Sequence, residues 1–594
     1  MRSTSVLRRA TIVLFITVAA SFSGTSARAQ GPYPAGTNAR GDWPLHSLDL
    51  HNSRYAPFDE INTSNVASLA QAWSFDTGVS LGQTTPLVVD GVLYVNSGSK
   101  MFAIDGATGE RVWSADIEPE FGQSGRGPAY GGGRLYAYGQ TTLFAMDAQS
   151  GRPVESFGTG GTLDVVNAAL DYAYPDQYPG RVDPVSLGYF SLTTPPTYYG
   201  GTVFVGLSHG DSHIPGGLLV AIDGVTGIVK WTFNPVPQVP TDEGWDVAEK
   251  TWRGGARVGA GIWTPPAIDP ELGLIYFNAS NPSPDFDGSA RLGENLFTNS
   301  TVAVHLETGK LAWYFQTIHH DIWDWDLASG PVLFDALVDG RTVKAIGSVG
   351  KTCYLYIWNR ETGQPINPMI ETPVPTYTDV PGEQVWPTQP IPYTARGVPQ
   401  QPYCAVLPSV TDPELAQRVR PTFHPYLVNE FVITSPGNTG GANYGPPSFS
   451  PRTGLVYVTG KNDAYSMKVQ PVGDSLRPGR PAVGFFETIA ERGETGMTAS
   501  QAVAAYDPGT GELAWYAEVP NATSSGNLVT AGDLVFQGVG GTLYAFDAHS
   551  GEQLSQSQLP RGTRASPMTY LSGGRQFVAV AVANSVVAFA LPSR

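Results

Sequence analysis

The sequence predicts an all-β protein, an eight-bladed β-propeller whose blades are docked by a recurring tryptophan. The 594 residues include 69 Gly and 49 Pro with 11% aromatic residues, a composition typical of many short strands joined by tight turns. Only 15% of the residues are charged, which excludes a disordered chain or a coiled coil. The third observation is a motif that recurs along most of the chain and sets the expected number of blades.

The recurring motif has the form Ala-x-Asp-x-x-Thr-Gly-x-x-x-Trp. Around each copy, short apolar runs alternate with Asp-Gly and Gly-Ser turns, the pattern of an antiparallel meander. The terminal Trp offers a large flat surface for packing against the next sheet. The gap between Asn359 and Asp507 is wide, so we expect a further copy to be hidden there and predict eight blades. The clear copies begin at Ala103, Ala221 and Ala505, and degenerate copies begin at Ala145, Ala303, Ile357 and Ala545.

Residues 1–29 have the pattern of a secretory signal peptide. Three arginines precede an apolar run over residues 10–20, and residues 27–29 read Ala-Arg-Ala, the form of a cleavage site. An uncleaved membrane anchor is the alternative, but the run is short for a membrane span. We therefore expect residues 30–594 to form a single propeller that is exported to the periplasm and has no membrane span.

The net charge of the chain disfavours one class of partner. The formal charge of -17, with 35 Lys and Arg against 52 Asp and Glu, disfavours nucleic acid as a partner.

A proline-rich insertion runs over residues 364–426. We expect it to be a surface excursion without a helix or a long strand. Long loops of a propeller collect on one face, so we also expect the insertion to border the active site.

One segment concentrates titratable side chains among aromatic residues. It contains His319, His320, Asp321, Asp324 and Asp326, and tryptophans stand between the last three. Burying so many titratable groups is costly unless a metal, hydrogen bonds or catalysis compensate. The segment is therefore the strongest candidate for a functional site.

The motif, this segment, the Asn281-Pro282 pair and the opening Gly41-Asp-Trp-Pro resemble the dehydrogenases that depend on pyrroloquinoline quinone (PQQ). The resemblance is greatest to the branch of membrane glucose dehydrogenase and polyvinyl-alcohol dehydrogenase. It implies oxidation of a primary or secondary hydroxyl of a polyol, polymer alcohol or bulkier compound to the carbonyl. It also implies hydride transfer to metal-bound PQQ and electron transfer to an external acceptor, such as a periplasmic cytochrome c or a quinone.

The resemblance also assigns residues to the site. Asp324 matches the catalytic base, and Lys351 matches the cation that hydrogen-bonds the quinone oxygens. An all-oxygen ligand set suits Ca2+, whereas Asp326 leaves a lanthanide open. Expected metal ligands are Asp211, Asn281 and Asp324, with Asp326 as a further candidate. Expected PQQ contacts are Gln83, Arg126, Thr193, Ser208, Trp263, Lys351 and Asn443.

Several departures from the family pattern leave alternatives open. No vicinal Cys pair precedes Arg126, and Gly122 stands where membrane glucose dehydrogenase has a histidine. Cys353 and Cys404 are the only cysteines, so a haem-attachment motif is absent, and the two either pair or remain free thiols. The alternative functions are a PQQ-dependent sugar (aldose) dehydrogenase and a non-catalytic propeller scaffold.

Overall fold

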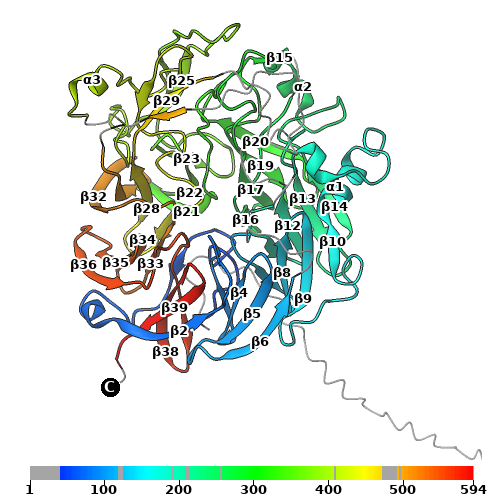
Figure 1. Cartoon of the computed structure of the whole chain (residues 1–594), viewed down its shortest axis with the longest axis vertical. Helices are drawn as coiled ribbons and strands as arrows, with labels where there is room; N and C mark the ends of the chain where they lie inside the picture. The colour runs from blue at the N-terminus through cyan, green and yellow to red at the C-terminus, as the bar shows by residue number, and fades with distance from the viewer. Residues whose placement is uncertain are drawn as a thin grey trace, which may run out of the picture.

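Eight sheets stand around a common centre and confirm the predicted eight-bladed β-propeller (Figure 1). The computed structural model describes residues 41–117, 125–189, 192–207, 214–254, 257–406, 410–470, 491–493, 495 and 497–592. The expected signal peptide, Gly122, Ser208 and Asp211 therefore lie outside the described residues.

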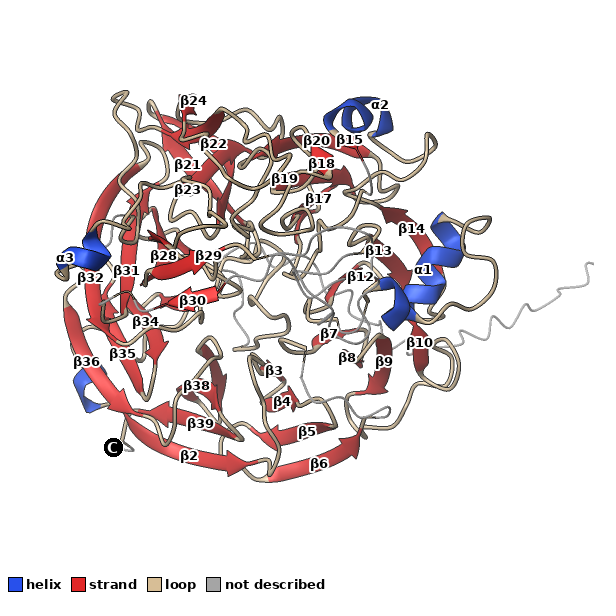
Figure 2. Cartoon of the chain, turned by 45° about the horizontal axis from the view of Figure 1, so that its top comes forward, coloured by secondary structure: helices blue, strands red, loops and turns tan. Residues whose placement is uncertain are grey.

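The first four blades are antiparallel sheets of four strands, and their last strands lie on the outer rim of the ring (Figure 2). Blade one contains β3 (Leu87–Val89), β4 (Val92–Asn96), β5 (Lys100–Asp105) and β6 (Arg111–Asp116), and blade two contains β7 (Ala129–Gly131), β8 (Arg134–Gly139), β9 (Thr142–Asp147) and β10 (Thr162–Asp164). Blade three contains β11 (Thr197–Tyr199), β12 (Thr202–Gly206), β13 (Leu219–Asp223) and β14 (Val229–Phe233), and blade four contains β16 (Ala267–Asp269), β17 (Leu274–Asn278), β19 (Ser300–His305) and β20 (Leu311–Gln316).

The remaining blades follow the same plan with local changes. Blade five has three strands, β21 (Val332–Val338), β22 (Arg341–Val349) and β23 (Leu355–Asn359). Blade six contains β27 (Ser448–Ser450), β28 (Leu455–Asn462), β31 (Ser500–Asp507) and β32 (Glu512–Pro520). Blade seven contains β33 (Asn527–Thr530), β34 (Leu534–Val539), β35 (Thr542–Asp547) and β36 (Gln553–Gln558), and blade eight contains β37 (Met568–Ser572), β38 (Arg575–Val582) and β39 (Ser585–Ala590).

The two ends of the chain meet in blade eight and close the ring. β2 (Ala70–Asp76), from the start of the propeller, pairs antiparallel with β39 from its end. β1 (Tyr55–Ala56) adds to blade seven by parallel pairing with β33. The expectation that a repeat is hidden between Asn359 and Asp507 is therefore wrong in its location. The eighth repeat escaped detection because its strands are split between the chain ends, while the gap holds the insertion and the first strands of blade six.

The motif residues dock five of the blades onto the next one. The indole N–H of Trp231 donates to the Leu306 carbonyl oxygen at 3.1 Å. Its ring lies against Gly309, where a Cβ atom would approach the ring to 2.5 Å and where φ is +68°. Glycine is therefore required both by the contact and by the backbone conformation. The same pairing joins Trp73 to Gly109, Trp113 to Gly151, Trp313 to Gly363 and Trp515 to Gly551.

The peripheral helices and small sheets lie outside the blades. The helices are α1 (Val165–Ala173), α2 (Trp245–Ala248) and α3 (Pro413–Ala416), with 3-10 turns at Val66–Ser68, Pro184–Leu187 and Glu249–Thr251. In the part of the chain that the structure describes, no helix has the length and apolarity needed to cross a membrane. Two small sheets pair β15 (Arg253–Gly254) with β18 (Arg291–Leu292), and β26 (Val432–Thr434) with β29 (Tyr465–Lys468) and β30 (Glu491–Gly493).

The proline-rich insertion contains more regular structure than expected. β24 (Met369–Pro373) and β25 (Thr388–Pro392) form an antiparallel hairpin, and α3 follows. Pro390 and Pro392 are two residues apart, so their missing N–H groups face the same edge of this two-stranded sheet. The hairpin therefore tolerates both prolines. A disulfide between Cys353 and Cys404, with Cα atoms 5.5 Å apart, ties the insertion to blade five.

Candidate functional site

A cavity of about 980 Å³ gathers most of the predicted site residues. Five of the predicted residues stand three to five positions before the first strand of a blade, as Gln83 does before β3 and Asn443 does before β27. The loops that start the blades therefore supply the wall. The predicted residues that line the cavity are Gln83, Arg126, Thr193, Trp263, Asp326, Lys351 and Asn443.

The same spacing before a first strand identifies wall residues that the sequence motifs did not indicate. Thr523 and Ser524 precede β33, and Arg564 precedes β37, at the spacing seen in the other blades. Alignment of the blades by their first strands would have found them. Lys461 and Asp463, at the end of β28, also line the cavity. A charged residue that ends an apolar strand was the only sequence signal for that pair.

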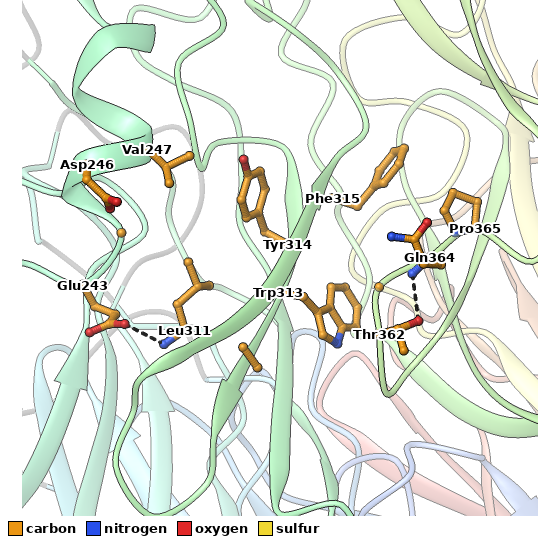
Figure 3. Close-up of a pocket in the computed structure, with 13 residues that line it drawn as sticks. Glu243, Asp246, Val247, Leu311, Trp313, Tyr314, Phe315, Thr362, Gln364 and Pro365 are labelled. Carbon is orange, nitrogen blue, oxygen red and sulfur yellow. Dashed lines mark hydrogen bonds between the residues drawn. The ribbon is translucent and has the colours of Figure 1, made fainter.

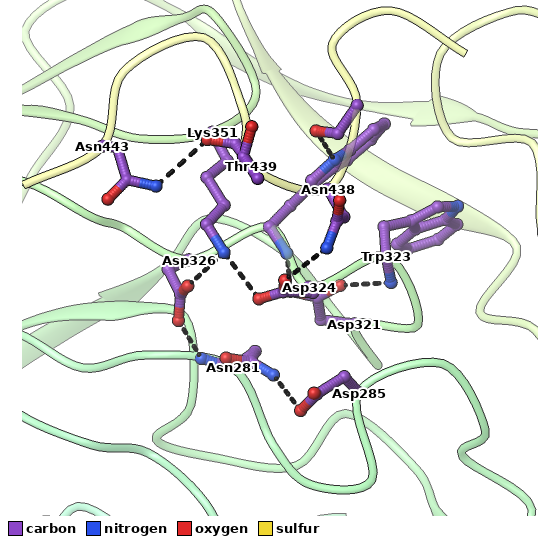
Figure 4. Close-up of polar contacts among 12 residues, drawn as sticks. Asn281, Asp285, Asp321, Trp323, Asp324, Asp326, Lys351, Asn438, Thr439 and Asn443 are labelled. Atoms are coloured by element: carbon purple, nitrogen blue, oxygen red, sulfur yellow. Dashed lines mark hydrogen bonds and ion pairs between the residues drawn. The ribbon is translucent and has the colours of Figure 1, made fainter. Parts of the chain in front are cut away.

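Two carboxylates share one buried ammonium at the edge of the cavity (Figure 4). The Lys351 Nζ atom lies 2.5 Å from Asp324 Oδ1 and 2.7 Å from Asp326 Oδ2, and the three side chains are at most 6% exposed. Asn438 Nδ2 donates to Asp324 Oδ2 at 3.2 Å. One cation between two anions leaves this cluster with a net negative charge, which favours a further cation.

Aromatic packing explains the alternation in the Trp323–Asp326 segment. The Trp323 and Trp325 rings are stacked with centroids 5.6 Å apart, and both are fully buried. Phe423 of the insertion packs edge-on against both rings. This cluster anchors one side of the segment, while Asp324 and Asp326 extend toward Lys351 (Figure 4).

The Asn281 side chain is oriented by its neighbours. Its Nδ2 atom donates to Asp285 Oδ1 at 2.9 Å, and its backbone N–H donates to Asp326 Oδ1 at 2.9 Å. Among the described residues, the buried Asn281 Oδ1 atom has no hydrogen-bond partner. An amide oxygen beside two carboxylates is a donor set that a hard cation such as Ca2+ prefers. Within the described ranges, no three His, Cys, Asp or Glu residues cluster as a metal site, and the position of Asp211 lies outside them.

Arg126 brings a second positive charge into the cavity. Its Nε atom donates to Gln83 Oε1 at 2.8 Å, and its Nη1 atom donates to the Trp263 carbonyl oxygen. The guanidinium lies 4.8 Å from the centre of the Trp263 ring and 5.0 Å from that of Tyr444. Burial lowers the pKa of Arg126 to about 9, so the group stays charged at neutral pH. A buried cation with neutral partners favours an anionic ligand.

The remaining predicted contacts differ in their surroundings. The Thr193 Oγ1 atom is buried and has no hydrogen-bond partner among the described residues. Asn443 Nδ2 donates to the Thr439 carbonyl oxygen at 3.0 Å, while its Oδ1 atom accepts from the Tyr444 N–H at 2.8 Å. The Asn443 side chain therefore also stabilises its own turn. Ser208 lies outside the described residues.

The insertion packs against the Asp324 segment and does not line the cavity. None of its described residues lines the cavity, but Phe423 and Glu383 contact the segment that carries Asp324.

A separate hollow of about 480 Å³ lies between α2 and β20 (Figure 3). Its wall includes Trp313, which docks blade four onto blade five, and the carboxylates of Glu243 and Asp246. It contains none of the predicted site residues.

Comparison with known proteins assigns the chain to a family. The family model described as "Glucose/ethanol/alcohol dehydrogenase, beta-propeller domain", a PQQ family, matches residues 43–485 and 515–578. The chain is 30% identical to a quinohemoprotein alcohol dehydrogenase of Comamonas testosteroni, over 95% of this chain and 76% of that protein. It is 26% identical to the glycerol dehydrogenase large subunit of Gluconobacter thailandicus, over 95% of this chain and 87% of that protein.

Two further similarities concern a third relative and a solved structure. The quinoprotein glucose dehydrogenase of Escherichia coli K12 is 26% identical, over 93% of this chain and 79% of that protein. The crystal structure of the Comamonas testosteroni quinohemoprotein alcohol dehydrogenase superposes with a TM-score of 0.73 at 26% identity. That superposition covers 93% of this chain and 81% of the other.

Proposed function

This chain belongs to the family of PQQ-dependent glucose, ethanol and alcohol dehydrogenases, and we propose that it oxidises a primary or secondary alcohol to the carbonyl. The observation that carries this proposal is the buried Asp324–Lys351 pair at the edge of a large cavity. A carboxylate held ionised by an adjacent cation is suited to accept the proton of a substrate hydroxyl. We infer that Asp324 is this base.

The residues of the cavity fit PQQ and a divalent cation. Arg126 offers a buried guanidinium to a carboxylate of this tricarboxylic cofactor, and Trp263 offers an aromatic face. Asp324, Asp326 and the Asn281 amide oxygen offer oxygen ligands to Ca2+, or to a lanthanide. When bound, PQQ supplies a two-electron acceptor and the cation supplies a Lewis acid.

The side chains of the site then have distinct roles at the reacting atoms. Asp324 Oδ1 takes the hydroxyl proton as the substrate carbon gives up its hydride. The Lys351 ammonium, 2.5 Å from that atom, stabilises negative charge in this buried site. Arg126, Gln83, Thr193 and Asn443 orient the cofactor, and Ser208 and Asp211 are proposed to complete its polar contacts and the metal site.

The cavity wall supports a hydroxylated substrate larger than a simple alcohol. Hydrogen-bonding side chains dominate the part of the wall that is not assigned to the cofactor or the metal. We therefore propose a polyol, a polymer alcohol or a bulkier hydroxyl compound, with an aldose as the alternative. The wall groups concerned are Thr439, Asp463, Tyr465, Thr498, Asn521, Thr523 and Ser524.

Export and electron transfer complete the proposal. The signal-like pattern of residues 1–29 supports the periplasm as the site of action. The chain has only two cysteines, and they pair with each other, so no haem is attached through a cysteine motif. We propose that electrons pass to an external acceptor, a periplasmic cytochrome c or a quinone.

The test uses the cofactor-free protein and a matched pair of variants. It is titrated with PQQ in the presence of Ca2+ or La3+, and dye reduction is followed with a panel of alcohols and sugars. Asp324→Asn should lower turnover by at least about 100-fold while PQQ still binds. Asp116→Asn, which breaks the exposed Lys100–Asp116 pair, should leave turnover unchanged. Absence of PQQ binding with either ion would refute the proposal.

A further inference from the structure

The backbone that carries Asp324 is held in an unfavourable conformation. Asp324 has a φ of +59° and His320 a φ of +49°, both in the left-handed region that L-residues rarely adopt. Such a conformation persists only where the surrounding contacts determine it. The question is therefore which groups hold this loop, residues 319–326, in place.

Asp321 binds the backbone on both sides of Asp324. Its Oδ1 atom accepts from the Trp323 N–H at 2.8 Å, and its Oδ2 atom accepts from the Trp325 N–H at 2.8 Å. Asn299 Nδ2 donates to Asp321 Oδ2 at 3.0 Å. Burial raises the pKa of the fully buried Asp321, and the two backbone N–H groups oppose this rise because they bind the charged form. The three groups that contact the two oxygens are all donors, so both oxygens act as acceptors.

The other end of the loop is fixed by the insertion. His320 Nε2 lies 2.7 Å from Glu383 Oε1, and both side chains are fully buried. His320 Nδ1 lies 2.8 Å from the Gly293 carbonyl oxygen, so both ring nitrogens face oxygen acceptors. Gln384 N donates to Glu383 Oε1 at 2.7 Å, and Gly288 N donates to Oε2. The Glu383 carboxylate is therefore also surrounded by donors.

Because donors surround both carboxylates, replacing either one with an amide of the same shape tests the role of its hydrogen bonds. An amide in place of either carboxylate would direct an NH2 group at a backbone N–H, although its size and shape would be conserved. A buried donor facing another donor loses its hydrogen bond without compensation from water. The 319–326 loop would then lose one of the contacts that hold it.

We propose that Asp321 and Glu383 are positioning residues that hold Asp324 and Asp326 in the geometry needed for metal binding and catalysis. Asp321 acts directly on the loop backbone, and Glu383 acts through His320. In this way the insertion contributes to the active site without lining it. The inference rests on the proposed function, because Asp324 and Asp326 are ligands and base only if that proposal holds.

The test compares two buried isosteres with an exposed one. Asp321→Asn and Glu383→Gln should each weaken Ca2+ binding to the PQQ-saturated protein, measured by calorimetry, by about 10- to 100-fold. Their kcat at saturating Ca2+ should fall, while the KM for the alcohol changes little. Glu371→Gln is the matched control, since Glu371 is 52% exposed and lies 3.1 Å from His319 Nε2. It should leave Ca2+ affinity and kcat within about twofold of the original protein.

The outcomes separate this inference from the proposed function. If the unsubstituted protein binds neither PQQ nor Ca2+, the proposed function fails. If it is active, and the buried isosteres lower only the thermal midpoint while Ca2+ affinity and kcat stay unchanged, the positioning roles are refuted. If Asp321→Asn does not fold, the Glu383→Gln variant tests the positioning roles, because Glu383 lies outside the 319–326 loop.

Discussion

Breaking the Cys353–Cys404 disulfide should destabilise the protein by an amount set mainly by the loop it closes. The two cysteines are 51 residues apart in sequence. Loss of a cross-link of that span increases the chain entropy of the unfolded state, which corresponds to about 4 kcal/mol at 25 °C. The sulfurs also pack against Gly441, where a Cβ atom would lie 2.4 Å from each, so the bond supports the backbone near Asn443.

The assay is guanidinium unfolding of the oxidised protein with and without a phosphine reductant. We expect the free energy of unfolding to fall by about 4 kcal/mol when the unfolded chain is reduced. The Cys353→Ala/Cys404→Ala variant is the control, and its unfolding should not respond to the reductant. A loss below about 1 kcal/mol would refute the loop-entropy reasoning, since the cross-link would then not restrict the unfolded chain.

Three other predictions follow from buried groups. Burial lowers the pKa of His46 from 6.5 to about 3, so the unfolded chain takes up this proton first as the pH falls. Unfolding free energy should drop by about 1.4 kcal/mol per pH unit between these values, and His46→Asn should flatten that slope in acid denaturation. Trp515→Ala removes the contact with Gly551 and should cost about 3–5 kcal/mol in denaturant unfolding, whereas a cost under about 1 kcal/mol would contradict docking. Lys351→Met leaves Asp324 and Asp326 without their shared cation, so thermal unfolding of the cofactor-free variant should become strongly Ca2+-dependent, and an unchanged Ca2+ response would oppose this interpretation.

The repeated motif made the fold accessible from the sequence. Trp, Thr-Gly and the flanking apolar runs each have a local physical reason, and the structure shows the Trp of one blade against the Gly of the next. The seven lining residues that the resemblance assigned also meet around one cavity. Five of the seven stand at a similar spacing before the first strand of a blade, so the repeated architecture brings them to one cavity.

Other features depended on contacts that no local pattern encodes. The eighth repeat was misplaced because β2 and β39 come from opposite ends of the chain. The His-His-Asp segment and the insertion were each identified from the sequence, but the pairing of His320 with Glu383 was not. Sequence left the state of Cys353 and Cys404 open, because only the three-dimensional arrangement brings their Cα atoms within bonding range.

The pairing of β2 with β39 sets the order in which the protein can fold. The outermost strand of blade eight is synthesised before the strands of blades one to six, yet its partners are the last strands to leave the ribosome. Until then, β2 lacks its partner and the ring stays open, with unpaired strand edges that favour association with other chains. Maturation of this ring is therefore a step that follows synthesis, and holding factors that keep the chain from premature association should raise its yield.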